Sequence, residues 1–252
     1  MKRFVINHLV VAALVVSAVL VSSCGKDDNG YKIKLLETIT WSWGDDEDGD
    51  IMKFEYDSQN RISRVLSYRD GKLFRTETHT YSDDDLVKIT IVYSDAPEGI
   101  MEQIIVRNGN TISMSMSMGG ENVTGTMSLN NDGYPISSVA SIGEYEEQEM
   151  IFHFHSGNLT KITVISYSDG EKNDEFEVLL TYDTNKSPLH YCKTPRWVMY
   201  LFTLNYNLGI NNNVIQRIEE VATLTFVYEF DNDGFPTKQT DSIGNVATFI
   251  YK

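Results

Sequence analysis

Apolar and polar residues alternate with a period of two along much of the chain. In Ile112–Met118 isoleucine and methionine alternate with serine, and similar alternation recurs in Phe176–Tyr182 and Ala222–Phe230. Successive side chains of a strand point to opposite faces, so this period predicts strands with one buried and one solvated face. The methionines Met114, Met116, Met118 and Met127 then belong to the core rather than to a metal or redox site.

Turn signals separate these stretches at intervals of about 11 to 14 residues. Asn-Gly and Asp-Gly pairs supply the positive φ that tight hairpins require, so each interval corresponds to one strand and one turn. The signals are Asp57–Asn60, Asp70–Gly71, Asp83–Asp85, Asp95–Gly99, Asn108–Gly109, Gly119–Gly120, Asp132–Gly133, Gly143, Ser156–Gly157, Asp169–Gly170 and Asp183–Lys186.

Alternate turns resemble each other more than adjacent ones, which indicates a hairpin repeat of roughly 25 residues. In copies such as Phe54–Ile62 and Tyr228–Pro236, an aromatic or aliphatic residue ends a strand and an Asp, Asn or Ser folds onto the turn backbone. The fold class predicted is all-β: a curved antiparallel β-meander of about 13 to 16 strands.

The segment 187–213 interrupts the repeat. Arg196–Leu204 is apolar on all sides and is therefore expected to be buried. We interpret it as a short helix or irregular plug that fills the concave side of the sheet. One further buried strand, or a lid over a ligand cavity, are the alternatives.

The polar face of the strands argues against a transmembrane barrel. Lys72, Thr76, Thr78 and Thr80 lie on the face opposite the core, whereas a membrane barrel presents apolar residues to lipid.

Residues 1–23 have the features of a signal peptide. Lys2 and Arg3 precede an apolar run, Leu9–Val21, that is shorter than the roughly 20 residues of a spanning helix. Val21–Cys24 resembles the lipobox of bacterial lipoproteins, which implies lipidation and cleavage at Cys24. The alternative is a plain secretory signal with a cysteine there by chance.

Residues 24–32 are polar and form a tether before a single domain at 33–252. Lys26–Asp28 resembles the signal that sends lipoproteins of Bacteroidota-type bacteria to the cell surface. The expected location is the outer membrane, anchored through the Cys24 lipid and displayed on the surface, or otherwise facing the periplasm. With Cys24 lipidated, Cys192 has no intramolecular partner and is expected to be a buried free thiol.

The composition fits one globular domain, because 41% of the 252 residues are hydrophobic. The formal net charge of −15 disfavours a nucleic-acid partner, which needs clustered Lys and Arg. No phosphate-binding loop or nucleophile elbow occurs in the sequence, and we expect no enzyme.

In the run Tyr56–Ile62, a Tyr-Asp pair is followed three residues later by an Arg-Ile pair. This pattern resembles the YD repeats of RHS-type surface proteins. Together, signal, tether and hairpins resemble a domain family of Bacteroidota surface lipoproteins, and the resemblance covers residues 33–252. It implies a curved RHS-like meander and no assigned activity. Long RHS shells need many more repeats, so encapsulation of a toxin is not implied.

Two clusters contain metal-ligand chemistry. Asp46, Asp48, Asp50 and Glu55 partly match a calcium loop, but the first Asp is missing and the flanks predict strands, so an acidic hairpin tip is the alternative. His153 and His155, two apart on one strand face near Glu147 and Glu149, could bind zinc or another divalent metal. The alternative is a solvated strand face, and we expect no cofactor.

Trp41 and Trp43 are the candidate ligand platform, because a glycan binder needs exposed aromatic rings with polar groups around them. The function expected is a non-enzymatic surface module that binds a glycan or a protein. The alternative is a carrier or structural envelope protein that shelters an apolar ligand, which requires a cavity of about 300 to 1,000 Å³.

Overall fold

The computed structural model describes residues 33–43, 49–118, 121–142 and 146–252. The chain divides into one unit up to Ile33 and a second, Lys34–Lys252, that contains the described strands and helix. The strands are β1 (Leu36–Ser42), β2 (Ile51–Tyr56), β3 (Ile62–Arg69), β4 (Lys72–Ser82), β5 (Asp85–Tyr93), β6 (Ala96–Asn108), β7 (Thr111–Met118), β8 (Glu121–Leu129), β9 (Pro135–Ile142), β10 (Glu146–His155), β11 (Asn158–Ser168), β12 (Glu171–Lys186), β13 (Asn212–Glu219), β14 (Ala222–Phe230), β15 (Pro236–Asp241) and β16 (Val246–Tyr251), and the helix is α1 (Arg196–Tyr206).

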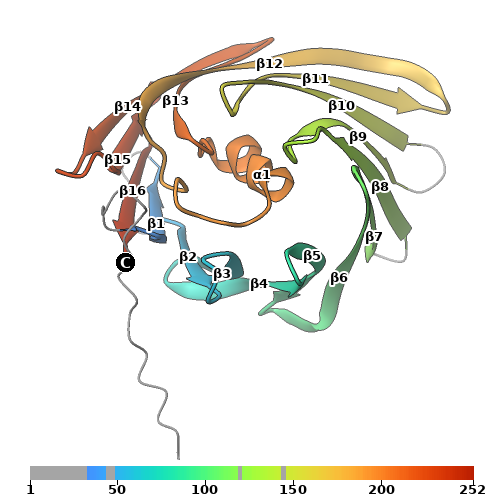
Figure 1. Ribbon diagram of the computed structural model, residues 1–252, viewed down its shortest axis with the longest axis horizontal. Helices are drawn as coiled ribbons and strands as arrows, with labels where there is room; N and C mark the ends of the chain where they lie inside the picture. Colours follow the sequence, from blue (N-terminus) through green and yellow to red (C-terminus); the bar gives the residue numbers. More distant parts are fainter. Residues whose placement is uncertain (1–32, 44–48, 119–120, 143–145) are drawn as a thin grey trace, which may run out of the picture. The chain divides into compact units, whose positions relative to one another are not determined.

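The strands pair antiparallel in sequence order and close into a barrel (Figure 1). The predictions of an all-β antiparallel chain and of sequential pairing are confirmed. The prediction of an open, curved meander is wrong. β1 pairs with β16, from Leu36 opposite Tyr251 to Ser42 opposite Val246. This pairing leaves no free edge strand, and unpaired edges are the costly feature of an open sheet.

The two ends of the barrel differ in which strands their turns connect. At the end where β1 begins, which we call the base, turns lead from even-numbered to odd-numbered strands. At the other end, which we call the rim, turns lead from odd-numbered to even-numbered strands. The backbones of Leu35 and Lys252 bond to each other in both directions, at 3.2 and 3.0 Å, so the barrel begins and ends at its base.

The apolar segment expected to fill the concavity is α1, which lies inside the ring of strands (Figure 1). Phe202 packs on Phe54 of β2, with 5.9 Å between ring centroids, and Tyr200 packs on Phe152 of β10 at 4.9 Å. These two strands lie on opposite sides of the ring. Barrels of 16 strands are too wide for wall side chains alone to fill, so a buried helix completes the core.

Asp and Asn side chains organise several hairpins in the way the repeat predicts. Oδ1 of Asp57 accepts the backbone N–H of Gln59 and of Arg61, each at 2.9 Å. Asn130, Asp231 and Asp241 accept from the second and fourth following N–H groups in the same way. The signal at Asp183–Lys186 is an exception, because these residues continue β12, which has register shifts there.

Tyrosines near the ends of five even-numbered strands bond to the strand that precedes each of them in the chain. Their hydroxyls donate to backbone carbonyls near the start of the preceding strand, at 2.6 to 2.8 Å. The pairs are Tyr56 with Leu36, Tyr81 with Ile62, Tyr182 with Leu159, Tyr228 with Val214 and Tyr251 with Pro236. In these five pairs the tyrosine satisfies a backbone acceptor at the barrel base.

The outward face of the strands is mainly polar. Lys53 lies between buried Met52 and Phe54, and Ser113, Ser115 and Ser117 of β7 alternate with inward-facing residues. Ion pairs join neighbouring strands on this face, among them Arg64–Glu55 at 3.0 Å, Lys88–Glu102 at 2.8 Å, Lys161–Glu177 at 2.5 Å and Lys238–Glu229 at 3.0 Å. Exposed apolar residues interrupt this face on several strands, among them Ile104 and Val106 of β6, Val227 of β14 and Ile250 of β16.

Within the described residues, no helix has both the length and the hydropathy needed to span a bilayer.

Candidate functional site

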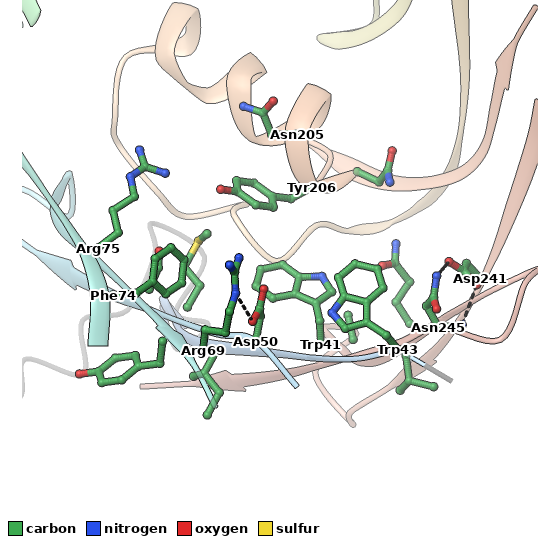
Figure 2. Close-up of a pocket in the computed structure, with 18 of the residues that line it drawn as sticks. Trp41, Trp43, Asp50, Arg69, Phe74, Arg75, Asn205, Tyr206, Asp241 and Asn245 are labelled. Carbon is green, nitrogen blue, oxygen red and sulfur yellow. Dashed lines mark hydrogen bonds and ion pairs between the residues drawn. The ribbon is translucent and has the colours of Figure 1, made fainter. Parts of the chain in front are cut away.

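A pocket of about 320 Å³ opens at the rim of the barrel, beside the C-terminal end of α1 (Figure 2). We call it the rim pocket. Its walls come from the rim ends of neighbouring strands, β15, β16, β1, β2, β3 and β4, and from the last helical turn. The residues that shape it include Trp41, Trp43, Asp50, Arg69, Phe74, Arg75, Asn205, Tyr206, Asn207, Gln239, Asp241 and Asn245.

Trp41 and Trp43 form one side of the rim pocket, as Figure 2 shows. They are two residues apart at the end of β1, so their side chains lie on the same face of the strand. Trp41 is half-buried and packs on Tyr206 of α1, with 5.5 Å between ring centroids and 32° between ring planes. Trp43 is 52% exposed. One indole is therefore held by the helix, and the other is available to a ligand.

Gly49 fixes the backbone beneath these tryptophans. A Cβ at Gly49 would lie 1.3 Å from the Trp41 carbonyl oxygen, so only glycine fits there. The Trp41 N–H donates to the Asp50 carbonyl at 2.8 Å, which joins the two sides of this hairpin. The close approach of two backbones therefore explains why a glycine occupies this position.

The end of α1 forms the opposite wall and is held by Asn207 and Arg217. Asn207 ends the helix in the left-handed conformation, with φ of 55°, and its N–H donates to Thr203. Arg217 on β13 donates to the Leu204 carbonyl at 2.8 Å and to Oδ1 of Asn207 at 3.1 Å. Since terminal helix carbonyls have no partner within the helix, the arginine fixes this turn in place.

The charged groups of the rim pocket have partners within the protein. Arg69 pairs with Asp50 at 3.4 Å. Both carboxylate oxygens of Asp241 accept bonds within the β15–β16 turn, from Ile243 and Asn245. The pocket therefore combines aromatic surfaces with amides and with charged groups that already have partners. This chemistry suits a ligand that has an apolar face and hydroxyl groups.

The calcium candidates do not come together among the described residues. Asp46 and Asp48 lie outside the described part of the chain. Asp50 faces Arg69, while Glu55 lies on the outer face and pairs with Arg64 at 3.0 Å. No group of three metal-binding side chains occurs within residues 33–43, 49–118, 121–142 and 146–252.

His153 and His155 lie exposed on β10, near the base. They pair in register with Lys161 and Asn158 of β11, so an ammonium group is the neighbour of His153. Glu149 of the same strand is within 3.5 Å of the Tyr167 hydroxyl. Among the residues that the structure covers, this face brings no third metal ligand to the two histidines.

Cys24 lies outside the described residues, and Cys192 is a free thiol. Cys192 is partly buried in the loop before α1 and donates to Oγ1 of Thr194 at 3.3 Å. Burial raises the pKa of this thiol above its ordinary value. Oγ1 of Thr194 also accepts the N–H of Ile62 at 2.8 Å, so the loop is tied to β3.

Sequence reasoning missed the helical contribution to the rim pocket and a charged cluster inside the barrel. Asn205 and Tyr206 follow the apolar run, and their role depends on where the helix ends. The inner face of β4 carries three charged or polar residues, Arg75, Glu77 and His79. They alternate along the strand with the outward threonines, so the two-residue period of a strand turns them inward. The alternation could have predicted this placement from the sequence, although charged residues rarely point into a core.

Comparison with known proteins shows similarity in fold. No family model matches the chain, and no curated protein matches it, so the resemblance to YD repeats and to a lipoprotein family gains no support. A solved porin-like protein from Bacteroides uniformis ATCC 8492 has 15% identity and a TM-score of 0.53, covering 85% of this chain and 96% of its own. A second from Bacteroides vulgatus ATCC 8482 has 11% identity and a TM-score of 0.42, covering 87% and 99%. At 15% identity, the first similarity establishes a shared fold and nothing further.

Proposed function

We propose that this protein is a non-enzymatic, lipid-anchored binding module whose rim pocket holds a sugar ring of a glycan. The observation that carries the proposal is the meeting of Trp41, Trp43 and Tyr206 in one pocket with side-chain amides around them. The C–H face of a pyranose packs on an aromatic ring, while its hydroxyls bond to amides such as Asn205. The pocket volume, about 320 Å³, falls in the range of small-molecule sites.

The outer surface of the barrel supports attachment through a lipid rather than through the strands. A membrane barrel presents an apolar band about 25 Å tall to lipid. Here lysine, arginine and glutamate occupy outward positions within the strands and pair between them. Such charges are costly in a bilayer, so we infer that the barrel lies in water and that Cys24 supplies the anchor.

The rim pocket and the start of the barrel lie at opposite ends of the strands. The chain enters at the base, through Lys34 and Leu36, while the rim pocket lies at the opposite end of the strands. A lipid on Cys24 would attach ten residues before Lys34. The base is then the end of the barrel nearest the anchor along the chain.

Two other functions receive less support. A pore, as the description of the neighbours would suggest, needs an open lumen, but α1 and its apolar partners occupy the lumen here. A carrier for a large apolar ligand needs at least about 300 Å³. The cavity left between α1 and β4, which we call the lumen cavity, has about 170 Å³.

The glycan proposal is tested by screening the protein on a glycan array and measuring each hit by calorimetry with Trp43→Ala. Trp43 is half exposed and ends its strand, so its removal is expected to weaken binding by at least tenfold while leaving the thermal unfolding midpoint within about 2 °C.

Phe230→Ala serves as the matched control, because Phe230 is an exposed aromatic residue on β14 at the base. It is expected to leave glycan affinity unchanged. Equal losses in both variants, or an array without any hit, would contradict a sugar site in the rim pocket.

A further inference from the structure

Two hydrogen-bond acceptors of the rim pocket are not explained by a neutral sugar ring. Such a ring accounts for the aromatic surfaces and for the exposed amide of Asn205. The pocket is also lined by the carboxylate of Asp50 and by the side-chain amide of Gln239, and each of these retains an acceptor oxygen. These two oxygens restrict the kind of sugar that the pocket can hold.

Asp50 uses only one of its two carboxylate oxygens. Oδ1 contacts Nε of Arg69 at 3.4 Å, which is long for a hydrogen bond between charged groups. Within the part of the chain that the structure describes, Oδ2 has no hydrogen-bonding or ionic partner. The side chain of Asp50 is 34% exposed, so its carboxylate is accessible to a molecule bound in the rim pocket.

Gln239 on β15 contributes the second acceptor. The hydroxyl of Tyr228 donates to the Val214 carbonyl, so its oxygen accepts from Nε2 of Gln239, at 2.6 Å. This contact fixes the orientation of the amide and leaves Oε1 as an acceptor. No described group donates to Oε1, and Oε1 is not an enclosed atom, although Gln239 as a whole is only 6% exposed. Its oxygen therefore meets accessible space, and the rim pocket is the space that Gln239 lines.

Trp41 lies between these two acceptors across the strands. It pairs with Ala247 of β16, which pairs with Gln239 of β15. On the other side, the Trp41 N–H bonds to the Asp50 carbonyl, and Figure 2 shows Asp50 next to Trp41. A sugar ring that packs on the indole therefore has a carboxylate on one side and an amide oxygen on the other.

The aromatic surfaces favour a positive charge in the ligand. The face of an aromatic ring carries a negative potential and attracts cations, most strongly in tryptophan. Trp43 offers such a face, because it is half exposed. The pocket already contains one contact of this kind, since the guanidinium of Arg69 lies 4.7 Å from the ring centroid of Phe74.

The rim is an acidic end of the barrel. Its turns carry Asp70, Asp95, Asp169, Glu171, Glu219 and Glu220, against Lys72 and Lys172. The two arginines of the pocket do not reverse this field, because Arg69 pairs with Asp50 and Arg75 pairs with Glu77. The formal net charge of the chain is also negative, at −15. The field at the rim therefore attracts cations and repels anions.

We propose that the sugar bound in the rim pocket is an amino sugar, with its ammonium group at Asp50, its ring on the indoles and a hydroxyl that donates to Gln239. This inference rests on the proposed glycan function and adds the charge of the ligand. An ammonium group has three donors and no acceptor, which complements a carboxylate oxygen that lacks a donor. An acidic sugar would instead bring a second carboxylate to Asp50.

The experiment compares three disaccharides that share one ring stereochemistry and linkage. Chitobiose carries ammonium groups, N,N′-diacetylchitobiose carries amides and cellobiose carries hydroxyls at the same carbon. Each is titrated calorimetrically into the full chain held in phosphatidylcholine nanodiscs, with empty nanodiscs as the blank, at about pH 6, where the amine is protonated. We expect chitobiose to bind about tenfold more tightly than either neutral disaccharide, because the ion pair and the contact with the indole add together.

The outcomes separate this inference from the sugar site itself. Equal affinities for the three disaccharides, or a preference for a neutral one, would overturn the amino-sugar assignment and leave the sugar site in place. Binding by none of them would overturn the assignment as well, and the glycan array then decides separately on the sugar site.

The decisive variant is Asp50→Asn, which keeps the shape of the side chain and removes its charge. We expect the ratio of chitobiose affinity to cellobiose affinity to fall at least fivefold. Glu55→Gln is the matched control, because it removes the same charge from the outer face of β2, where Glu55 pairs with Arg64. It should leave the ratio unchanged. An equal fall in both variants would show that the preference comes from the overall charge, and would refute the role of Asp50.

A spectroscopic measurement on the unmodified protein does not depend on how well a variant at Asp50 folds. In the ¹⁵N-labelled protein, chitobiose should shift the indole N–H resonance of Trp43, which is identified by its absence from the spectrum of Trp43→Ala. The indole resonance of Trp197, which is buried in α1, should stay in place. A Trp43 resonance that does not move while chitobiose binds would show that the ammonium groups bind elsewhere on the acidic surface, and would overturn the proposal.

Discussion

At the scale of single residues, Gly49 determines where the tryptophans of the rim pocket lie. Its backbone approaches the Trp41 carbonyl so closely that a methyl group would collide with the oxygen. The clash is with backbone and not with the end of a flexible side chain, so the β1–β2 hairpin must shift to relieve it.

Gly49→Ala is therefore expected to lower the free energy of unfolding by about 1 to 3 kcal/mol, the usual cost of overpacking. It should also weaken glycan binding, because the shift moves both indoles. Urea denaturation and calorimetry measure the two effects. Ser42→Ala, which alters the opposite face of β1, should change stability by less than about 0.5 kcal/mol, and an equal loss there would argue against the backbone explanation.

Individual residues show what a sequence can and cannot reveal about this molecule. The turn role of Asp57 follows from local chemistry, since its partners lie within four residues. The hydroxyl of Tyr182 bonds to Leu159, 23 residues away, and only the strand pairing brings them together. Trp41 and Trp43 were recognisable as candidates by their chemistry, whereas Tyr206 joined them only through the position of the helix.

At the scale of elements, α1 is a helix that its own sequence supports poorly. Its 11 residues are below the length at which isolated helices become stable, no side chain caps its N-terminus, and its ends carry no charges that favour the helix dipole. Its formation depends on packing within the barrel. This explains why the sequence predicted a buried plug more clearly than the conformation of that plug.

Phe202→Ala is expected to reduce the free energy of unfolding by about 3 to 5 kcal/mol, because it removes the ring that packs on Phe54 and leaves a cavity. Leu201→Ala is the matched control within the helix. Leu201 is 36% exposed and borders the lumen cavity, so its loss should cost clearly less. Denaturant unfolding of both variants measures the difference, and equal costs would show that α1 does not hold the core together.

At the scale of the whole molecule, closure of the barrel is the feature that the sequence left undetermined. Strand periodicity and turn spacing depend on neighbours along the chain and correctly predicted an antiparallel meander. The pairing of Thr40 with Thr248, by contrast, joins residues at opposite ends of the domain, and nothing in either strand distinguishes it from an open edge. Closure also makes α1 necessary, since a ring of 16 strands is wider than its side chains can fill.

The barrel and the proposed anchor lead to a final prediction about the membrane. Polar and charged groups predominate on the outward strand faces, although apolar residues such as Val227 and Ile250 are exposed there, while α1 and apolar residues fill the lumen. A membrane barrel has the reverse arrangement, an apolar exterior and a wet interior. Membrane attachment should therefore depend on Cys24 alone.

The unmodified protein is expected to take up labelled palmitate and to need detergent for extraction. A variant exported by a cleaved signal that lacks the cysteine should be unlabelled and should fractionate with soluble proteins. If that variant stays in the membrane without detergent, the strands themselves contact lipid, and the water-exposed barrel is wrong.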